Sequence, residues 1–393
     1  MKLKLFLLLF ISFFMTGCWN YSELSDMAIV SSVAVDIENE EYLVSFLITN
    51  AQKPDSDSQN NSATMTIISG KGNTVVEAIN NLDLKMPKEH YLGHMSSLII
   101  SEDVAKNTLE VFDYFFRNPE SIKKFDFIIS KDKAVNTLKV ISPLEIFPSE
   151  SIISNLREIN KEQGVISETL YSDFLNDVLT EGKNPVVATI KISGNIENAD
   201  DDEDLNKTDI KTFIDVDSMA LFSDYNFITY ANKKESKGIN IIRNKVKSLY
   251  VSINCDNGNS VSKANNLKTK ISLKFEDNKP VFSISAEAEM QMQETTCNYD
   301  LEKDKVIKEL EKKYAKEIKK IIKSAVDLAQ KEKTDVLGFG NMVYKKNLSY
   351  WKKNNKKWDK EIFPTLVVEI KTKVNLISNG SIENTLKGAA DNE

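Results

Sequence analysis

Histidines, the side chains that most often bind metals in proteins, are few in this chain. It contains two histidines, His90 and His94, whose spacing of four could place two metal ligands on one face of a helix. The zinc-protease pattern needs a glutamate directly after the first histidine, and Tyr91 stands there instead. No third ligand is evident, and Gly93 argues against a helix at this place. The sequence therefore predicts no metal site.

A glycine-containing stretch, Ser69-Gly70-Lys71-Gly72, is the one candidate phosphate cradle. It lacks the third glycine of the dinucleotide fingerprint and the spacing of a P-loop. A tight turn that leads into a helix N-cap at Asn73 or Thr74 explains it equally well. Neither a G-x-S-x-G elbow nor a Cys/His pair with an orienting acid is present. The sequence thus predicts no enzyme activity, no catalytic residue and no cofactor.

Cys18 is the residue with the clearest predicted chemistry. Lys2 and Lys4 precede an apolar run at 5–15, which is too short for a bilayer span of roughly 20 residues but has the length of a signal-peptide core. The following Met15-Thr16-Gly17-Cys18 resembles a lipobox, in which the chain is cut before the cysteine and the sulfur is acylated. Two or three acyl chains anchor a protein stably. We therefore predict a signal peptide at 1–17 and a lipid anchor at Cys18.

The two other cysteines, Cys255 and Cys297, lie too far apart for a zinc ribbon or a CxxC redox motif. In a protein exported from the cytoplasm, such a pair is a candidate disulfide. Two unpaired cysteines in the core are the alternative, and the sequence leaves both open.

The composition indicates an exported body with an ordinary solvated surface. The net charge is −7 and 28% of the residues are charged, so there is no basic excess of the kind that nucleic-acid binding requires. No later stretch is long and apolar enough to cross a membrane. The chain after residue 17 suffices for two or three domains.

The first half of the chain alternates between strand-like and helical patterns. The sequence predicts strands at 27–36, 42–49, 64–69, 98–101, 125–130 and 185–192, and helices at 74–84, 103–116, 134–140, 149–161 and 167–179. Such alternation is typical of a mixed sheet covered by helices. We predict an N-terminal mixed α/β domain at 18–141. Residues 142–194 form a middle domain or an extension of the first.

An acidic stretch follows, with five consecutive acids from Asp200 to Asp204. It lacks the alternating ligands, central glycine and closing glutamate of a calcium loop. We interpret residues 195–212 as a solvated linker and as the main domain boundary.

The second half, 213–385, is predicted to be an α+β domain. Strands are expected at 217–222, 247–254 and 365–376, and a hairpin joins 267–275 to 281–292 around Asp277-Asn278-Lys279. One long helix, 301–331, carries a single apolar stripe that should cover the hairpin sheet. In the aromatic stretch 344–363, Trp351 and Trp358 are expected on one helix face as core residues. The predicted fold class is α+β, multi-domain, with mixed sheets flanked by helices and one long amphipathic helix near the C-terminus.

Several of these stretches, in this order, resemble the Ger(x)C family of spore germination lipoproteins. The matching segments are Gly17-Cys18-Trp19, 28–30, 72–78, 94–105, Asp335-Val336-Leu337-Gly338-Phe339-Gly340, Tyr350-Trp351, Trp358 and Phe363-Pro364. Together they extend from residue 17 to about residue 380. The departures are Ser31-Ser32, where the family more often has glycine, and the acidic linker.

The resemblance implies a role that residue patterns do not show. Members of this family are C subunits of nutrient germinant receptors. They are lipid-anchored on the outer face of the spore's inner membrane and accompany membrane-embedded A-type and B-type subunits. The resemblance also implies three mixed α/β domains.

Two function classes follow for this chain. The first is a non-enzymatic receptor subunit that docks on membrane partners and supports nutrient sensing and germination. The alternative is a lipid-anchored solute-binding protein that delivers a small nutrient to a permease, which would favour two similar lobes around a cleft.

Overall fold

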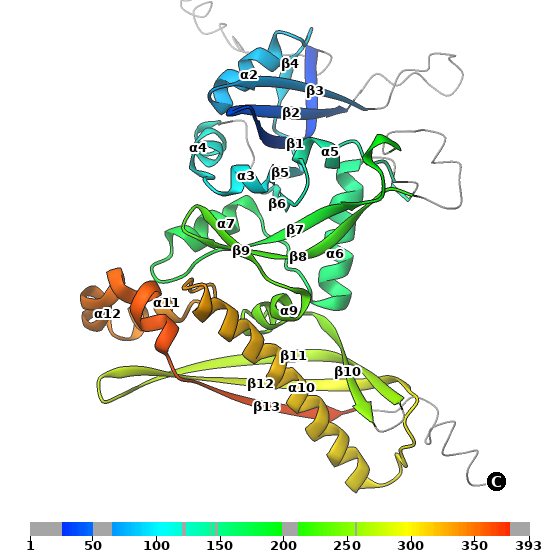
Figure 1. Cartoon of the computed structure of the whole chain (residues 1–393), viewed down its shortest axis with the longest axis vertical. Helices are drawn as coiled ribbons and strands as arrows, with labels where there is room; N and C mark the ends of the chain where they lie inside the picture. The colour runs from blue at the N-terminus through cyan, green and yellow to red at the C-terminus, as the bar shows by residue number, and fades with distance from the viewer. Residues whose placement is uncertain are drawn as a thin grey trace, which may run out of the picture.

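The protein is built on two β-sheets with helices between and around them (Figure 1). The computed structural model describes residues 26–49, 65–119, 123–142, 144–145, 148–198, 211–255 and 258–377. Both sheets are mixed, and helices pack on their faces. The predicted α+β class of mixed sheets flanked by helices is confirmed.

The large sheet contains nine strands in the order β3-β2-β1-β5-β6-β7-β8-β9, with β4 paired to the start of β1. The strands are β1 Met27–Glu38, β2 Glu41–Thr49, β3 Met65–Gly72, β4 Glu89–Tyr91, β5 Ser97–Ser101, β6 Asp126–Ser130, β7 Val186–Ser193, β8 Phe213–Ser223 and β9 Asn226–Tyr230. Strands β1, β5, β6 and β7 run parallel in the centre. The central strands β5 and β6 are buried along their whole length, as their near-continuous apolar sequences require.

Two core clusters lie on opposite faces of the large sheet, because successive side chains of a strand point to opposite faces. On β5, Leu98 and Ile100 face one cluster and Ile99 faces the other. The helices of this part are α2 Val75–Asp83, α3 Glu102–Ala105, α4 Leu109–Arg117, α5 Ala134–Thr137, α6 Pro148–Gln163, α7 Tyr171–Leu179 and α9 Lys233–Ile242. Side chains of α2, α3, α4 and α7 fill one cluster, and those of α5, α6 and α9 fill the other.

Two predicted helices differ from the structure. The helix predicted at 103–116 is divided into α3 and α4, because Thr108 binds the carbonyl of Tyr225 through both its amide and its hydroxyl. Helix α4 therefore turns its exposed side chains Leu109 and Phe116 outward and buries Val111, Phe112 and Phe115. The helix predicted from 167 begins at Tyr171, since the preceding residues are extended and the Thr169 carbonyl accepts the Phe127 amide.

The acidic stretch connects two neighbouring strands of one sheet. Strands β7 and β8 pair antiparallel with Ser193 opposite Phe213, so residues 194–212 lead from one strand to its direct partner. The sequence predicts the main domain boundary at 195–212, whereas the large sheet continues across it to Tyr230. The acids 200–204 themselves lie outside the described residues. Hydrophilic composition marks a surface connection, but it does not tell a hairpin loop from a domain linker.

The second sheet has the order β10-β11-β12-β13. Its strands are β10 Ser248–Cys255, β11 Gly258–Glu276, β12 Lys279–Thr295 and β13 Val368–Leu376. The predicted hairpin is confirmed: Asp277 and Asn278 have positive φ values of 49° and 60°, as a type I′ turn requires. The returning strand β13 lies parallel to β12.

Helix α10, Asp304–Lys331, crosses the second sheet (Figure 1). Its predicted apolar stripe is buried, and it packs against β10 and β13, which confirms that it covers this sheet. Helix α10 also packs against α9, a helix that was not predicted from the sequence. Gly238 of α9 permits this contact, since a Cβ atom there would lie 2.3 Å from the carbonyl oxygen of Ile321.

The aromatic stretch forms helices α11 Phe339–Lys346 and α12 Leu348–Asn354, followed by short turns of 3-10 and π-helix up to Thr365. Trp351 and Trp358 are buried and their ring centroids lie 5.5 Å apart, so the prediction that both are core residues is confirmed. They belong to different elements, however, and not to one helix face. Within the described parts of the chain, no helix combines the length and the hydropathy of a membrane span.

Candidate functional site

The structure separates the two histidines. His90 lies on β4 and its Nδ1 is 2.7 Å from Oδ1 of Asp83, while the ring of His94 packs against the edge of the Tyr91 ring. Among the residues that the structure describes, no three His, Cys, Asp or Glu side chains are grouped as metal ligands. Each histidine side chain thus contacts a neighbouring side chain of the fold, His90 that of Asp83 and His94 that of Tyr91.

Gly70 and Gly72 lie within strand β3 and not in a turn. A Cβ atom on Gly70 would be 2.1 Å from the Ala78 carbonyl oxygen, so the glycines let α2 pack directly on the strand backbone. Thr74 is the N-cap of α2, and its hydroxyl accepts the amide of Glu77 at 3.1 Å. The predicted N-cap at Thr74 is confirmed. The stretch 69–72 serves helix packing, because its glycines face a helix and not an open loop.

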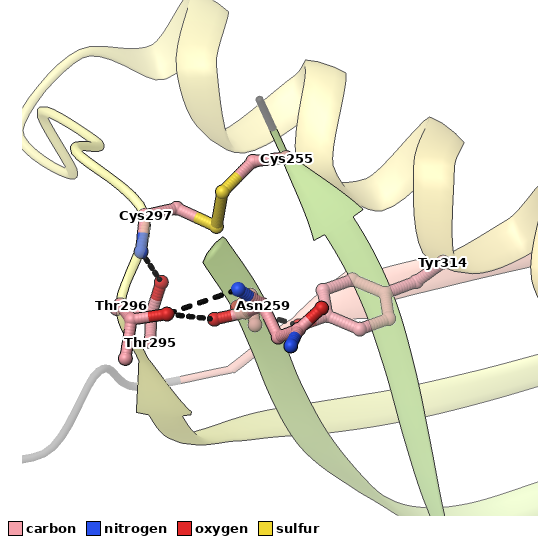
Figure 2. The surroundings of a disulfide bond; sticks show 7 residues. Cys255, Asn259, Thr295, Thr296, Cys297 and Tyr314 are labelled. Carbon is pink, nitrogen blue, oxygen red and sulfur yellow. Dashed lines mark hydrogen bonds between the residues drawn. A yellow bond between two sulfur atoms is a disulfide. The ribbon is translucent and has the colours of Figure 1, made fainter. Parts of the chain in front are cut away.

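Cys255 and Cys297 form a disulfide in the structure, with 6.1 Å between their Cα atoms (Figure 2). Cys255 ends β10, and Cys297 follows β12, so the bridge passes over the start of β11. Thr296 Oγ1 accepts the Asn259 amide at 3.0 Å beside the bridge, and Tyr314 of α10 meets Ser260 Oγ at 2.9 Å. The bridge thus ties together the ends of two strands that do not pair. The predicted lipid site, Cys18, lies outside the described residues.

The most elaborate polar cluster surrounds Asp335, between α10 and α11. This carboxylate is fully buried, and four N–H groups donate to it. Its Oδ1 accepts the amides of Gly338 and Phe339 at 2.8 and 3.1 Å. Its Oδ2 accepts the Gly340 amide at 2.6 Å and the Trp358 indole at 2.9 Å. Asp335 therefore satisfies the first amides of α11 and holds the Trp358 ring in place.

The protonation state of Asp335 follows from these contacts. Burial raises the pKa of this carboxyl to about 6, and the donated hydrogen bonds from Gly340 and Trp358 oppose the rise. At neutral pH the group is therefore ionised. Only the carboxylate form suits the geometry, because all four described neighbours of the two oxygens are donors.

The same residues join the second sheet to the large sheet. The carbonyl of Asp335 accepts the Asn184 amide at 2.9 Å, and Asn184 Nδ2 donates to Asp359 Oδ2 at 3.1 Å. Thr334 Oγ1 donates to the carbonyl of Phe222, at the end of β8, at 2.6 Å. We call residues Gly182, Asn184, Thr334, Asp335 and Asp359 the Asp335 joint.

Two glycines bring the two sides of the joint into backbone contact. Gly182 has a φ of +72°, and a Cβ atom on it would lie 2.4 Å from the carbonyl carbon of Gly340. The Asn341 amide donates to the Gly182 carbonyl at 2.9 Å, and the Trp351 indole donates to Glu181 at 2.9 Å. The joint is therefore closely packed as well as hydrogen-bonded, which fixes the second sheet on the first.

The stretch 335–340 carries part of the family resemblance, but no local pattern assigns a role to Asp335. The local signal is an acid three residues ahead of a Gly-Phe-Gly helix start. Asn184 lies 151 residues before Asp335, and Phe222 lies 112 residues before Thr334. No local pattern in the sequence predicts contacts over such separations. Only the folded chain brings them together.

Fold and site together define a protein with two mixed sheets whose main polar cluster joins the sheets to each other. Comparison with known proteins identifies the family of this chain. The family model described as "Spore germination protein N-terminal domain" matches residues 20–192, and "Spore germination B3/ GerAC like, C-terminal" matches residues 217–380. The chain belongs to the Ger(x)C family of spore germination proteins.

Individual relatives match over almost the whole chain. Spore germination protein KC of Bacillus subtilis is 26% identical, over 94% of each chain. Spore germination protein GerQC of Bacillus cereus is 24% identical, over 89% of this chain and 93% of the relative. The crystal structure of the GerBC protein shares the fold, with a TM-score of 0.54, 15% identity and coverage of 88% of this chain and 97% of GerBC.

Proposed function

We propose that this chain is the lipid-anchored, non-enzymatic subunit of a nutrient germinant receptor. It is attached through Cys18 to the outer face of the spore's inner membrane and docks on membrane-embedded A-type and B-type subunits. The observation that carries the proposal is the match of both halves of the chain, in order, to spore germination proteins. The Asp335 joint supports the proposal. Because the joint fixes the two sheets to each other, a displacement caused by a partner at one sheet can be transmitted to the other sheet.

The alternative is a solute-binding protein for a permease. Such a protein favours two similar lobes around a cleft. Here the large sheet has nine strands with helices on both faces, and the second sheet has four strands crossed by one long helix. The two parts are dissimilar, and this favours the receptor subunit.

Replacing Cys18 by alanine should abolish lipid attachment, because the thiol is the only acceptor that the predicted lipobox offers. We expect spore-forming cells fed a radioactive fatty acid to label the parent chain and not the Cys18→Ala variant, and the variant to be released from the membrane or held on it less firmly. Asp327→Ala, which changes an exposed side chain far from Cys18 in sequence, is the control and should keep its label. Equal labelling of the Cys18→Ala variant and the parent would contradict the anchor.

Binding measurements separate the two functions. The lipid-free chain, residues 19–393, should show no saturable binding of amino acids, sugars or nucleosides in calorimetry at millimolar ligand. The full-length tagged chain, purified from spore membranes in mild detergent, should carry two membrane-embedded subunits with it. Selective sub-millimolar binding of one nutrient by the isolated chain, with no membrane subunit recovered, would favour the solute-binding protein.

A further inference from the structure

An open apolar groove lies between helices α2 and α4 of the large sheet. Its volume is about 820 Å³. Val75, Val76, Leu109, Tyr114 and Pro119 form its apolar lining. Val76 and Leu109 are 52% and 51% exposed, although both side chains are large and apolar. Exposed apolar side chains that gather around a hollow are typical of a surface that binds another molecule.

The polar lining of the α2–α4 groove is mainly acidic. Glu89, Glu110 and Asp113 line it, against one cation, Arg117. Arg117 is already paired with Asp113, with Nε 2.8 Å from Oδ2. Among the described residues, neither Glu89 nor Glu110 forms an ion pair with a cation. This acidic lining favours an occupant that is apolar and positively charged.

The position of the groove indicates where its occupant comes from. Glu89 and His90 line it, and β4, which carries them, pairs with Met27 and Ala28 at the start of β1. Asp26 lies eight positions after Cys18, a stretch that can span at most about 28 Å when fully extended. Helices α2 and α4, which line the groove, lie toward the end of the molecule that is next to the proposed anchor, whereas the second sheet lies at the opposite end (Figure 1).

We propose that the α2–α4 groove binds a basic amphipathic helix of a membrane-embedded partner protein. The proposal rests on the proposed function, since it takes Cys18 as the anchor and a membrane protein as the partner. Helices dock into grooves through apolar side chains at spacings of three and four, which suits the lining at Val76, Leu109 and Tyr114. Lysine or arginine beside this apolar face would pair with Glu89 and Glu110. A surface of anionic lipids would instead be repelled by these carboxylates.

Site-specific crosslinking in the full-length, anchored chain tests the proposal. A photoreactive phenylalanine analogue is placed at Leu109, and in a control chain at Leu144, which is 87% exposed and outside the groove. We expect the Leu109 chain to form an adduct with a polytopic membrane subunit, attached within a helix that contains lysine or arginine. The Leu144 chain should form none.

A substitution pair gives the second readout. Leu109→Lys should lower the membrane subunit recovered with the tagged chain at least tenfold, because it removes an apolar contact and repels the cations of the partner helix. Leu144→Lys should recover as much of the subunit as the parent. Both positions are exposed, so equal thermal unfolding of the two variants shows that folding is unaffected.

The possible outcomes are distinct. Full recovery of the partner by Leu109→Lys, or an adduct from Leu109 with lipid or with a second copy of this chain, would overturn the groove proposal and leave the receptor function standing. If the parent chain recovers no membrane subunit, the proposed function fails as well.

Discussion

Replacing Asp335 by alanine is expected to lower the free energy of unfolding by about 4 kcal/mol. Four buried N–H donors lose their acceptor at once, and the indole of Trp358 loses the group that positions it. Leaving one buried donor unsatisfied costs about 1–3 kcal/mol, and water that enters the space left by the side chain offsets part of the sum. Since domains are stable by only about 5–15 kcal/mol, the loss is a large fraction of the total.

Denaturant titration of the lipid-free chain, followed by tryptophan fluorescence and circular dichroism, measures this effect. Asp327→Ala is the matched control, because Asp327 is an exposed acid on α10 that pairs with Lys323 one turn away. Its removal should change stability by less than about 0.5 kcal/mol. We expect fluorescence to report loss of the joint at lower denaturant than circular dichroism does. A shift for Asp335→Ala as small as that for Asp327→Ala would refute the central role of the carboxylate.

Breaking the Cys255–Cys297 bridge should cost a similar amount. The two cysteines are 42 positions apart in sequence, and closing a loop of this length lowers the entropy of the unfolded chain enough to stabilise the folded state by about 4 kcal/mol. Cys255→Ala, Cys297→Ala and the double variant should therefore lose the same stability, because each removes the one bridge. The second sheet should unfold first, since the bridge joins the ends of its strands β10 and β12.

Intact mass after alkylation, with and without prior reduction, shows whether the bridge forms in the folded protein. The unreduced lipid-free chain should take up no alkylating reagent, and the reduced, unfolded chain should take up two. Reductant should lower the unfolding midpoint of the parent and leave that of the double variant unchanged. Two freely alkylated thiols in the unreduced parent would mean that the pair is reduced, and the stability prediction would then fail.

The nature of each local signal explains which elements were predictable. Some elements were predicted because residues close together in sequence specify them. They are strands β5 and β6, the Asp277-Asn278 hairpin and the apolar stripe of α10. Apolar runs, turn residues with positive φ and a 3.6-residue period act within a few positions of the chain. Helix α9 was not predicted, because Gly238 interrupts its pattern of apolar residues. The local sign of this helix is the capping box formed by Asn232 and Glu235 at its start.

Other features of the fold depend on contacts between residues that are distant in sequence. Whether Leu109 and Phe116 are buried depends on how Thr108 binds Tyr225, and whether 195–212 divides two domains depends on the pairing of β7 with β8. The sequence alone determined the mixed α/β class and the family resemblance, since these rest on composition, period and order, and it alone carries the prediction of an export signal. The tertiary structure alone decided the Asp335 joint and the α2–α4 groove. The reason is physical: a buried carboxylate or an open groove is produced by segments that meet only after folding, and no local pattern specifies that meeting.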